Sequence, residues 1–263
     1  MSFLRRFLGG SGVNSARLNV PCFTRLRDDA MLPVVGEYYR QASVRLARPP
    51  GPNDLPPGMP GPPPGYYKAL LVAEPANQYD RNAIAVVLWA GGTWSLAGYL
   101  SRTDAASYQP VFRWLAATAG ATPPAVACDA ALQSERGGVG VVLHLGTPGE
   151  CIVELATDNR TPADSTWGGK SVVFSGQGST TLYGAPLDRN AQVMLARWAG
   201  CEVLPRLTKK TQVLIVADSN EVTTTLQKAR DYGVPIVPEP NFVAALGIPP
   251  QIIGGVSERW ARL

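Results

Sequence analysis

Hydroxyl and cationic side chains recur along the second half of the chain at points where a phosphate group can be held. Ser175 and Gly176 come directly after an apolar strand, where the chain opens into a loop. A hydroxyl group and a free backbone N–H at such a point can bind one or two phosphate oxygens. Lys210 and Lys228 can add positive charge from a neighbouring turn and helix. The alternative is that Lys209 and Lys210 are only solvated charges in a turn.

A second group of residues combines aromatic rings, an amide and a carboxylate. Tyr38 and Tyr39 precede the run E-P-A-N-Q-Y-D-R-N-A-I, which contains Asn77, Tyr79 and Asp80. Aromatic rings stack on unpaired bases, which contributes about 1–3 kcal/mol per base. A carboxylate accepts a hydrogen bond from a hydroxyl group and repels a phosphate. The alternatives are an Asx-type turn at Asn77 and Asp80, and core packing for Tyr79 and for Tyr99 farther along. If Tyr38 and Tyr39 lie on a strand, one of them must point inward.

Other kinds of chemistry find no support in the sequence. The single histidine, His144, lies in the apolar stretch VVLHL and fits a structural role. The glycines after Ser175 lack the lysine and the spacing of a nucleotide-binding loop. The four cysteines are far apart and form no closely spaced pair, so we expect no metal site and no cofactor. Two disulfides are arithmetically possible, but reduced core thiols are the preferred interpretation. We therefore predict a protein that binds and does not catalyse; a cryptic nuclease is the least favoured alternative.

Composition sets broad limits on the fold and the partners. The chain has 263 residues, of which 45% are hydrophobic and 17% are charged, which predicts folded domains. Its formal net charge of +4 permits a nucleic-acid partner without requiring one. No apolar run reaches about 18 residues, so no membrane span is expected. The start, MSFLRRFLGG, does not have the order of a secretory signal. We expect a mobile tail there, or a small amphipathic helix docking on a partner, and a cytoplasmic protein that is nucleoid-associated if bacterial.

The first half of the chain has the pattern of an all-β domain with a short helix. Residues 1–30 are expected to be a flexible tail and residues 31–147 a domain, interrupted by a proline-rich loop at 48–65. Apolar and β-branched runs predict the strands, and apolar spacing predicts a helix over Asp104–Ala117. The expected strands are Val34–Gly36, Ser43–Leu46, Lys68–Ala73, Asn82–Trp89, Trp94–Leu100, Val126–Leu132 and Val139–Leu145.

The second half alternates between strand and helix patterns. Residues 148–167 are expected to be a linker, residues 168–247 a domain, and residues 248–263 a C-terminal tail. Strands alternating with helices predict an α/β fold with a four-stranded parallel sheet flanked by helices. The expected strands are Lys170–Phe174, Cys201–Leu204, Val213–Ala217 and Val234–Val237; the expected helices are Leu187–Ala199, Glu221–Tyr232 and Glu239–Leu246.

Residues 33–147 resemble the HIRAN domain, a β-barrel module. The resemblance is carried by Val35-Gly36-Glu37-Tyr38-Tyr39, by the run LVAEPANQYDRNAIAV from Leu71 to Val86, and by Gly98-Tyr99-Leu100-Ser101-Arg102. It implies binding of single-stranded DNA at a 3′ end. By resemblance, Tyr38 and Tyr39 stack on bases, and Asn77 and Tyr79 line the site. Asp80 meets the 3′-hydroxyl, and Tyr99 and Arg102 flank it, with Arg102 facing a phosphate.

Residues 168–247 resemble a BRCT domain. The matching pieces are the strand opened by Gly169-Lys170, then Ser175-Gly176, a helix ending at Ala199-Gly200, Leu207-Thr208-Lys209-Lys210-Thr211, Lys228-Ala229, and Gly233-Val234-Pro235. The resemblance implies a phosphate pocket of Ser175, Gly176 and Lys228. The branch that binds a DNA 5′-phosphate adds an arginine and a lysine, here Arg189 and Lys210. A single domain of this kind suits DNA ends, because phosphopeptide binding usually uses a tandem pair.

The two resemblances together predict a non-catalytic module that recognises DNA ends or breaks in repair or replication. Its expected partners are DNA with single-stranded 3′ ends, nicks or 5′-phosphate ends, together with DNA repair or replication proteins. The alternative is a protein-interaction adaptor that recruits repair enzymes through the BRCT-like domain.

Overall fold

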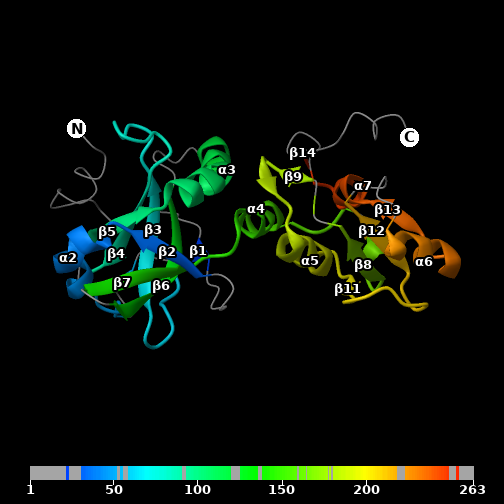
Figure 1. Ribbon diagram of the computed structural model, residues 1–263, viewed down its shortest axis with the longest axis horizontal. Coiled ribbons are helices and arrows are strands. Elements are labelled where there is room, and N and C mark those ends of the chain that lie inside the picture. Colours follow the sequence, from blue (N-terminus) through cyan, green and yellow to red (C-terminus); the bar gives the residue numbers. More distant parts are fainter. Residues whose placement is uncertain are drawn as a thin grey trace. The chain divides into compact units, whose positions relative to one another are not determined.

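The computed structural model divides into two compact units, Met1–Gly146 and Thr147–Leu263 (Figure 1). The structure describes residues 22–23, 31–51, 54–55, 59–90, 93–119, 125–135, 138–158, 160–163, 165–176, 178, 180–217, 223–248 and 253–254. Most of the two predicted tails therefore lies outside the described residues.

Six antiparallel strands of the first unit form a closed barrel. They follow one another in the order β6, β3, β4, β5, β2, β7, and the ring closes because β6 also pairs with β7. The strands are β2 (Met31–Val35), β3 (Tyr67–Ala73), β4 (Ile84–Trp89), β5 (Trp94–Leu100), β6 (Ala125–Glu135) and β7 (Gly138–His144). A short strand within the predicted tail, β1 (Cys22–Phe23), runs parallel to β6. The prediction of an all-β barrel is confirmed at this level.

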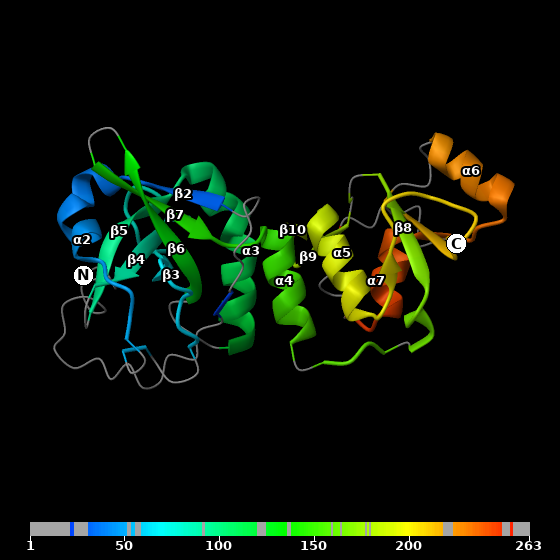
Figure 2. The ribbon, with the colours of Figure 1, turned by 90° about the horizontal axis from the view of Figure 1, so that it is seen from below.

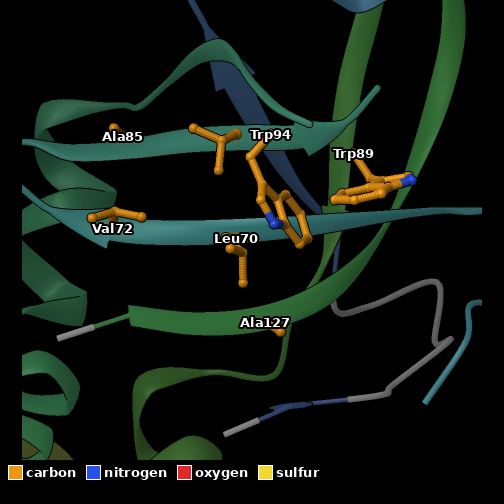
Figure 3. Packing of buried hydrophobic residues seen from close by; sticks show 7 residues of the cluster. Leu70, Val72, Ala85, Trp89, Trp94 and Ala127 are labelled. Carbon is orange, nitrogen blue, oxygen red and sulfur yellow. The ribbon is translucent and has the colours of Figure 1, made fainter. Parts of the chain in front are cut away.

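The central strands β3 and β4 are buried on both faces. Their apolar side chains are buried whichever face of the strand they lie on, which is why the sequence shows nearly unbroken apolar runs. One cluster contains Leu70, Val72, Ala85 and Val87 and ends at the edge-to-face pair of Trp89 and Trp94 (Figure 3). Leu55 and Met59 of the proline-rich loop pack against this cluster. The loop therefore covers part of the barrel wall.

One predicted strand of the first unit is wrong. Residues 43–46 belong to α2 (Gln41–Leu46), which follows the 3-10 helix η3 (Glu37–Arg40). The side-chain amide of Gln41 explains this difference. It accepts a hydrogen bond from Val139 N at 2.9 Å and donates one to Val139 O at 3.0 Å, as a paired strand would do. A helix can therefore lie against this part of β7. The predicted helix is present as α3 (Arg102–Ala119).

The second unit is an α/β fold built on a four-stranded parallel sheet. The strand order is β11 (Glu202–Val203), β8 (Ser171–Ser175), β12 (Val213–Val216) and β13 (Ile236–Pro238). Helices α5 (Arg189–Trp198), α6 (Thr224–Tyr232) and α7 (Glu239–Ala245) connect or follow these strands, as predicted. The side chains of Asp188 and Thr223 cap the first turns of α5 and α6. Figure 2 shows α5 and α7 beside β8.

The predicted linker at 148–167 is wrong for most of its length. It contains α4 (Pro148–Thr157) and the short 3-10 helix η4 (Ser165–Trp167). Thr147 and Glu150 form a capping box, a signal that stands in the sequence as T-x-x-E. The helix packs so closely in the second unit that a Cβ at Gly149 would lie 2.2 Å from the carbonyl oxygen of Pro186.

The second unit also contains a small antiparallel sheet that the sequence reading did not anticipate. It consists of β10 (Ala185–Pro186), β9 (Thr181–Leu182) and β14 (Ile253–Gly254), the last within the predicted C-terminal tail. In the described part of the chain, no helix is both long and apolar enough to cross a bilayer.

Candidate functional site

The predicted residues of the first unit meet at one end of the barrel. Tyr99 in β5 pairs with Ala85 in β4 on one side and with Val35 in β2 on the other. The helix η3 begins just after β2, and the turn from β3 to β4 leads into Ala85. Strand register therefore places the paired tyrosines of η3, the 74–83 turn and the 99–102 segment around the same barrel end.

The 74–83 turn is shaped by its own side chains. Asn77 Oδ1 accepts hydrogen bonds from the backbone N–H of Tyr79 at 3.0 Å and of Asp80 at 3.3 Å. Asp80 Oδ1 accepts one from Asn82 N at 2.8 Å. The turn-forming alternative is therefore confirmed for both residues. Asp80 Oδ2 lies 3.6 Å from Arg102 Nε, so these two predicted residues are also brought together.

Three tyrosines of this site are exposed. Tyr38, Tyr39 and Tyr79 are 70%, 85% and 85% exposed. Because Tyr38 and Tyr39 lie on a 3-10 helix and not on a strand, both can face solvent, and their rings meet edge to face with centroids 5.5 Å apart. Exposed rings of this size normally pack inside or meet a partner. These rings are free to stack on a planar ligand.

Tyr99 is the half-buried member of the group. Its hydroxyl donates to Glu74 Oε2 at 3.2 Å, and Glu74 also accepts from Asn77 Nδ2 at 3.0 Å. Burial, and then the Glu74 carboxylate, raise the pKa of Tyr99, while Arg40 opposes that rise. Tyr99 therefore stays protonated and holds Glu74 in place. Sequence reasoning missed Glu74 and Arg40, although both adjoin the aromatic and carboxylate residues that it selected.

The second candidate site lies at the carboxyl end of the parallel sheet. Ser175 ends β8 beside Val216 of β12, and its carbonyl accepts from Ala217 N at 3.0 Å. Gly176 follows with φ +87, a left-handed conformation that turns the chain away from the sheet. The carboxyl edge of an open parallel sheet is the usual place for a ligand in α/β folds.

Arg189 joins Ser175 and Gly176 at this edge. It is the first residue of α5, and its Nη2 donates to the carbonyl oxygen of Gly176 at 2.7 Å. Its guanidinium lies 5.7 Å from the ring centroid of Phe174. Burial lowers the pKa of Arg189 and Glu239 raises it again; an arginine so placed keeps its charge. Three of the five predicted phosphate-site residues are therefore close together.

The structure does not bring Lys210 to that site. The carbonyl oxygen of Lys210 accepts a hydrogen bond from Ser171 Oγ at 2.9 Å, at the start of β8, whereas Ser175 is at its end. At about 3.3 Å per residue, these two ends of the strand are roughly 13 Å apart. The prediction failed because a turn before a parallel strand reaches the amino edge of the sheet, opposite the carboxyl edge.

Lys228 lies on α6, which follows the carboxyl end of β12. Leu226 and Ala229 are the buried residues of this helix, and Lys228 is exposed. No hydrogen bond or ion pair joins Lys228 to Ser175 within the described ranges. That Lys228 shares a phosphate with Ser175 stays a prediction.

A cleft of about 250 Å³ marks the amino edge of the parallel sheet. It has an apolar floor with cations at its rim, and it is lined by Ser171, Glu202, Leu204, Pro205, Arg206, Thr208 and Lys210. The sequence reading selected one residue of this cleft, Lys210, for a different site.

The four cysteines form no disulfide. Burial raises the pKa of the Cys128 thiol well above its usual range and that of Cys201 to about 11. His144 is buried on β7. Within the described residues, no group of three or more His, Cys, Asp or Glu side chains is placed to hold a metal ion. No family model matches this chain, and no curated protein matches it.

Proposed function

We propose that this protein binds DNA ends or breaks without catalysing a reaction, as a module of DNA repair or replication. The HIRAN-like barrel takes the 3′ end of a single strand, and the BRCT-like unit takes a 5′-phosphate or a repair partner. The observation that carries the proposal is the set of three exposed tyrosines, Tyr38, Tyr39 and Tyr79, around a turn that presents Asp80.

The chemistry of the barrel end supports a strand terminus as its ligand. Exposed tyrosine rings offer stacking surfaces for unpaired bases. Arg102, whose side chain is 85% exposed, lies beside Asp80 and can turn to a phosphate. The carboxylates of Asp80 and Glu74 lie on the same turn, where they accept hydrogen bonds and disfavour a further phosphate.

Fluorescence anisotropy on a panel of labelled DNA ends tests this part of the proposal. We expect single-stranded DNA with a free 3′-hydroxyl to bind more tightly than the same strand with a 3′-phosphate. Asp80→Asn removes the charge but keeps the side chain's shape and the acceptor for Asn82 N, so it should weaken this preference. Equal binding of both 3′ ends by the wild type would contradict the proposal for the barrel.

The second unit offers a hydroxyl and a guanidinium at one sheet edge. Ser175 and Arg189 lie on either side of Gly176, and both can contact a single phosphate group. The guanidinium of Arg189 has further N–H donors, so it can bind a 5′-phosphate while Nη2 keeps its hydrogen bond to Gly176 O. We expect tighter binding to 5′-phosphorylated ends than to 5′-hydroxyl ends, with a strong dependence on salt.

The adaptor alternative is supported by the cleft at the amino edge of the same sheet. Its apolar floor of Leu204 and Pro205, with Arg206 and Lys210 nearby, suits a peptide of a partner protein more than a bare phosphate. Pull-down from nuclease-treated lysate separates the two functions. Partners that depend on Arg206 and Leu204, but not on DNA, would favour the adaptor.

A further inference from the structure

The second unit has a buried carboxylate near the candidate phosphate site of Ser175, Gly176 and Arg189. Glu239 is the first residue of α7 and is 0% exposed. Its Oε2 accepts a hydrogen bond from Thr180 N at 3.2 Å, and its Oε1 accepts one from Gln192 Nε2 in α5. Burying a carboxylate is costly unless hydrogen bonds and nearby positive charge compensate. A buried glutamate in this position therefore calls for a specific role.

The segment from Gly176 to Thr180 is held at both ends by groups of opposite charge. Arg189 binds the carbonyl oxygen of Gly176, and Glu239 binds the N–H of Thr180. Between them, Gly178 passes so close to the chain just before α5 that a Cβ there would lie 1.9 Å from the carbonyl oxygen of Leu187. The described part of this segment is thus fixed against α5 and α7.

Glu239 and Arg189 also act on each other. Glu239 is the charge that opposes the effect of burial on the Arg189 guanidinium. Gln192 lies on α5 one turn after Arg189 and joins Glu239 to that helix. The carboxylate therefore influences both the segment that carries Gly176 and the cation that would bind a phosphate.

We propose that Glu239 is a positioning residue of the phosphate site. It holds α5, which carries Arg189, and the backbone N–H of Thr180 in the arrangement that accepts a terminal phosphate, without touching that phosphate itself. This inference rests on the proposed binding of a 5′-phosphate by the second unit. It assigns a role to a residue that the sequence reading used only to begin a helix.

Glu239→Gln tests the role of the charge with little change of shape. The new amide keeps an oxygen to accept from Thr180 N. Its nitrogen meets Gln192, whose Oε1 is buried without a hydrogen-bond partner in the described structure. Rotation of the Gln192 amide restores the hydrogen bond. The variant should therefore fold, which a thermal melt checks.

The measurement compares one DNA duplex with a 5′-phosphate end and the same duplex with a 5′-hydroxyl end, using the full chain. All 3′ ends carry a phosphate, so the barrel contributes equally to both. We expect the preference of the wild type for the 5′-phosphate to fall by about tenfold in Glu239→Gln, the effect of losing a charge-assisted hydrogen bond. The salt slope of 5′-phosphate binding should decrease by about 1 as the Arg189 contact is lost.

A double-mutant cycle shows whether Glu239 acts through Arg189. Arg189→Met should lower the same preference, and adding Glu239→Gln to it should change nothing further. The matched control is Glu202→Gln, which removes an exposed glutamate from the opposite edge of the same sheet. It should leave the ratio between the two ends unchanged.

The possible outcomes distinguish a failure of the role of Glu239 from a failure of the proposed 5′-phosphate site. Equal binding of both ends by the wild type overturns the phosphate site and, with it, the role of Glu239. A wild-type preference that survives Glu239→Gln overturns the inference alone. If Glu239→Gln weakens binding to the 5′-phosphate and 5′-hydroxyl duplexes equally, Glu239 only supports the fold. That result also overturns the inference.

A measurement on the wild type decides the matter if the variant does not fold. The Arg189 side-chain Nε–H and the Thr180 backbone N–H are followed by NMR during titration with the 5′-phosphorylated duplex. Both signals should shift together, and the 5′-hydroxyl duplex should shift neither. A shift of Arg189 without Thr180 contradicts a shared arrangement.

Discussion

The two candidate sites differ in how their residues are supported. At the barrel end, Tyr38, Tyr39 and Tyr79 are exposed and held only by short local elements, η3 and the 74–83 turn. At the edge of the parallel sheet, a hydrogen bond joins Arg189 to Gly176, and the buried Glu239 holds Thr180 and the α5 residue Gln192 nearby. Exposed rings can adapt to bases of any sequence, whereas a phosphate requires donors in fixed positions. The comparison suggests an adaptable site in the first unit and a preorganised one in the second.

Asp129 in the barrel and Glu239 in the second unit are both buried carboxylates, and their hydrogen-bond partners differ in kind. In the barrel, Lys68 Nζ donates to Asp129 Oδ1 at 2.6 Å, and both side chains are within 1% of complete burial. In the second unit, Glu239 accepts from neutral groups, an amide and a backbone N–H. The first arrangement is a charge pair inside the wall of the barrel. The second leaves its negative charge available to act on Arg189.

The largest expected effect is on the barrel's ion pair. Lys68→Ala leaves Asp129 buried without its partner, and we expect the first unit to lose about 3–5 kcal/mol of stability. The double replacement Lys68→Met with Asp129→Leu removes both charges and should cost much less. Chemical denaturation followed by the fluorescence of Trp89 and Trp94 measures this. A loss in the double variant as large as in the single one would show that the charges themselves are needed.

The next largest expected effect is on the binding of single-stranded DNA, whose bases stack on the exposed tyrosine rings of the barrel. Replacing Tyr38 and Tyr39 together by Ala removes two exposed rings, and we expect a loss of about 1–3 kcal/mol for each base that stacks on them. Binding of single strands with a 3′-hydroxyl measures the loss, and the preference of the second unit for a 5′-phosphate should stay as it is. The matched control is Tyr232→Ala, an exposed tyrosine of α6. Equal losses in both variants would contradict a specific stacking surface at the barrel.

A smaller effect on 5′-phosphate binding distinguishes Arg189, at the carboxyl edge of the parallel sheet, from Lys210, at its amino edge. Arg189→Met should weaken binding to a 5′-phosphate by about tenfold, because a charged hydrogen bond is lost. Lys210→Met removes one positive charge from the opposite edge, and we expect little change in the preference for the phosphate. Anisotropy titrations at two salt concentrations provide both values. The reverse order of effects would restore Lys210 to the phosphate site and remove Arg189 from it.

The sequence predicted the parts of this fold that depend on local patterns. Unbroken apolar runs located β3 and β4, and alternating strands and helices led to the parallel sheet. Residues 43–46 were misread because a distant contact, Gln41 with Val139, takes the place of strand pairing. Nothing in the sequence of residues 43–46 indicates that contact.

Prediction of the site residues failed where three-dimensional position decides. Lys210 has suitable chemistry, but strand direction puts it at the other edge of the sheet, and the place of Lys228 in the site stays a prediction. Glu74 and Glu239 were missed because nothing in the sequence marks a carboxylate as buried or shared by two elements. Arg189 was selected by resemblance, and the structure gives it a hydrogen bond to Gly176.

The smallest effect tests where the second unit begins. Thr147 caps α4 because its side-chain hydroxyl accepts a hydrogen bond from Glu150 N, while Glu150 Oε2 accepts one from Thr147 N. Thr147→Ala should therefore destabilise the unit that contains α4 by about 1 kcal/mol. Because α4 packs against Pro186 and Ala191 through Gly149, the loss of stability should appear in the unfolding of the second unit. The fluorescence of Trp167 and Trp198 reports this unfolding once the tryptophans of the barrel have been substituted. If only the unfolding transition of the barrel changed, α4 would belong to the first unit. The boundary between the two units would then lie on the C-terminal side of α4. An effect on the second unit would show that its folded structure includes α4, which lies before the residues that resemble a BRCT domain.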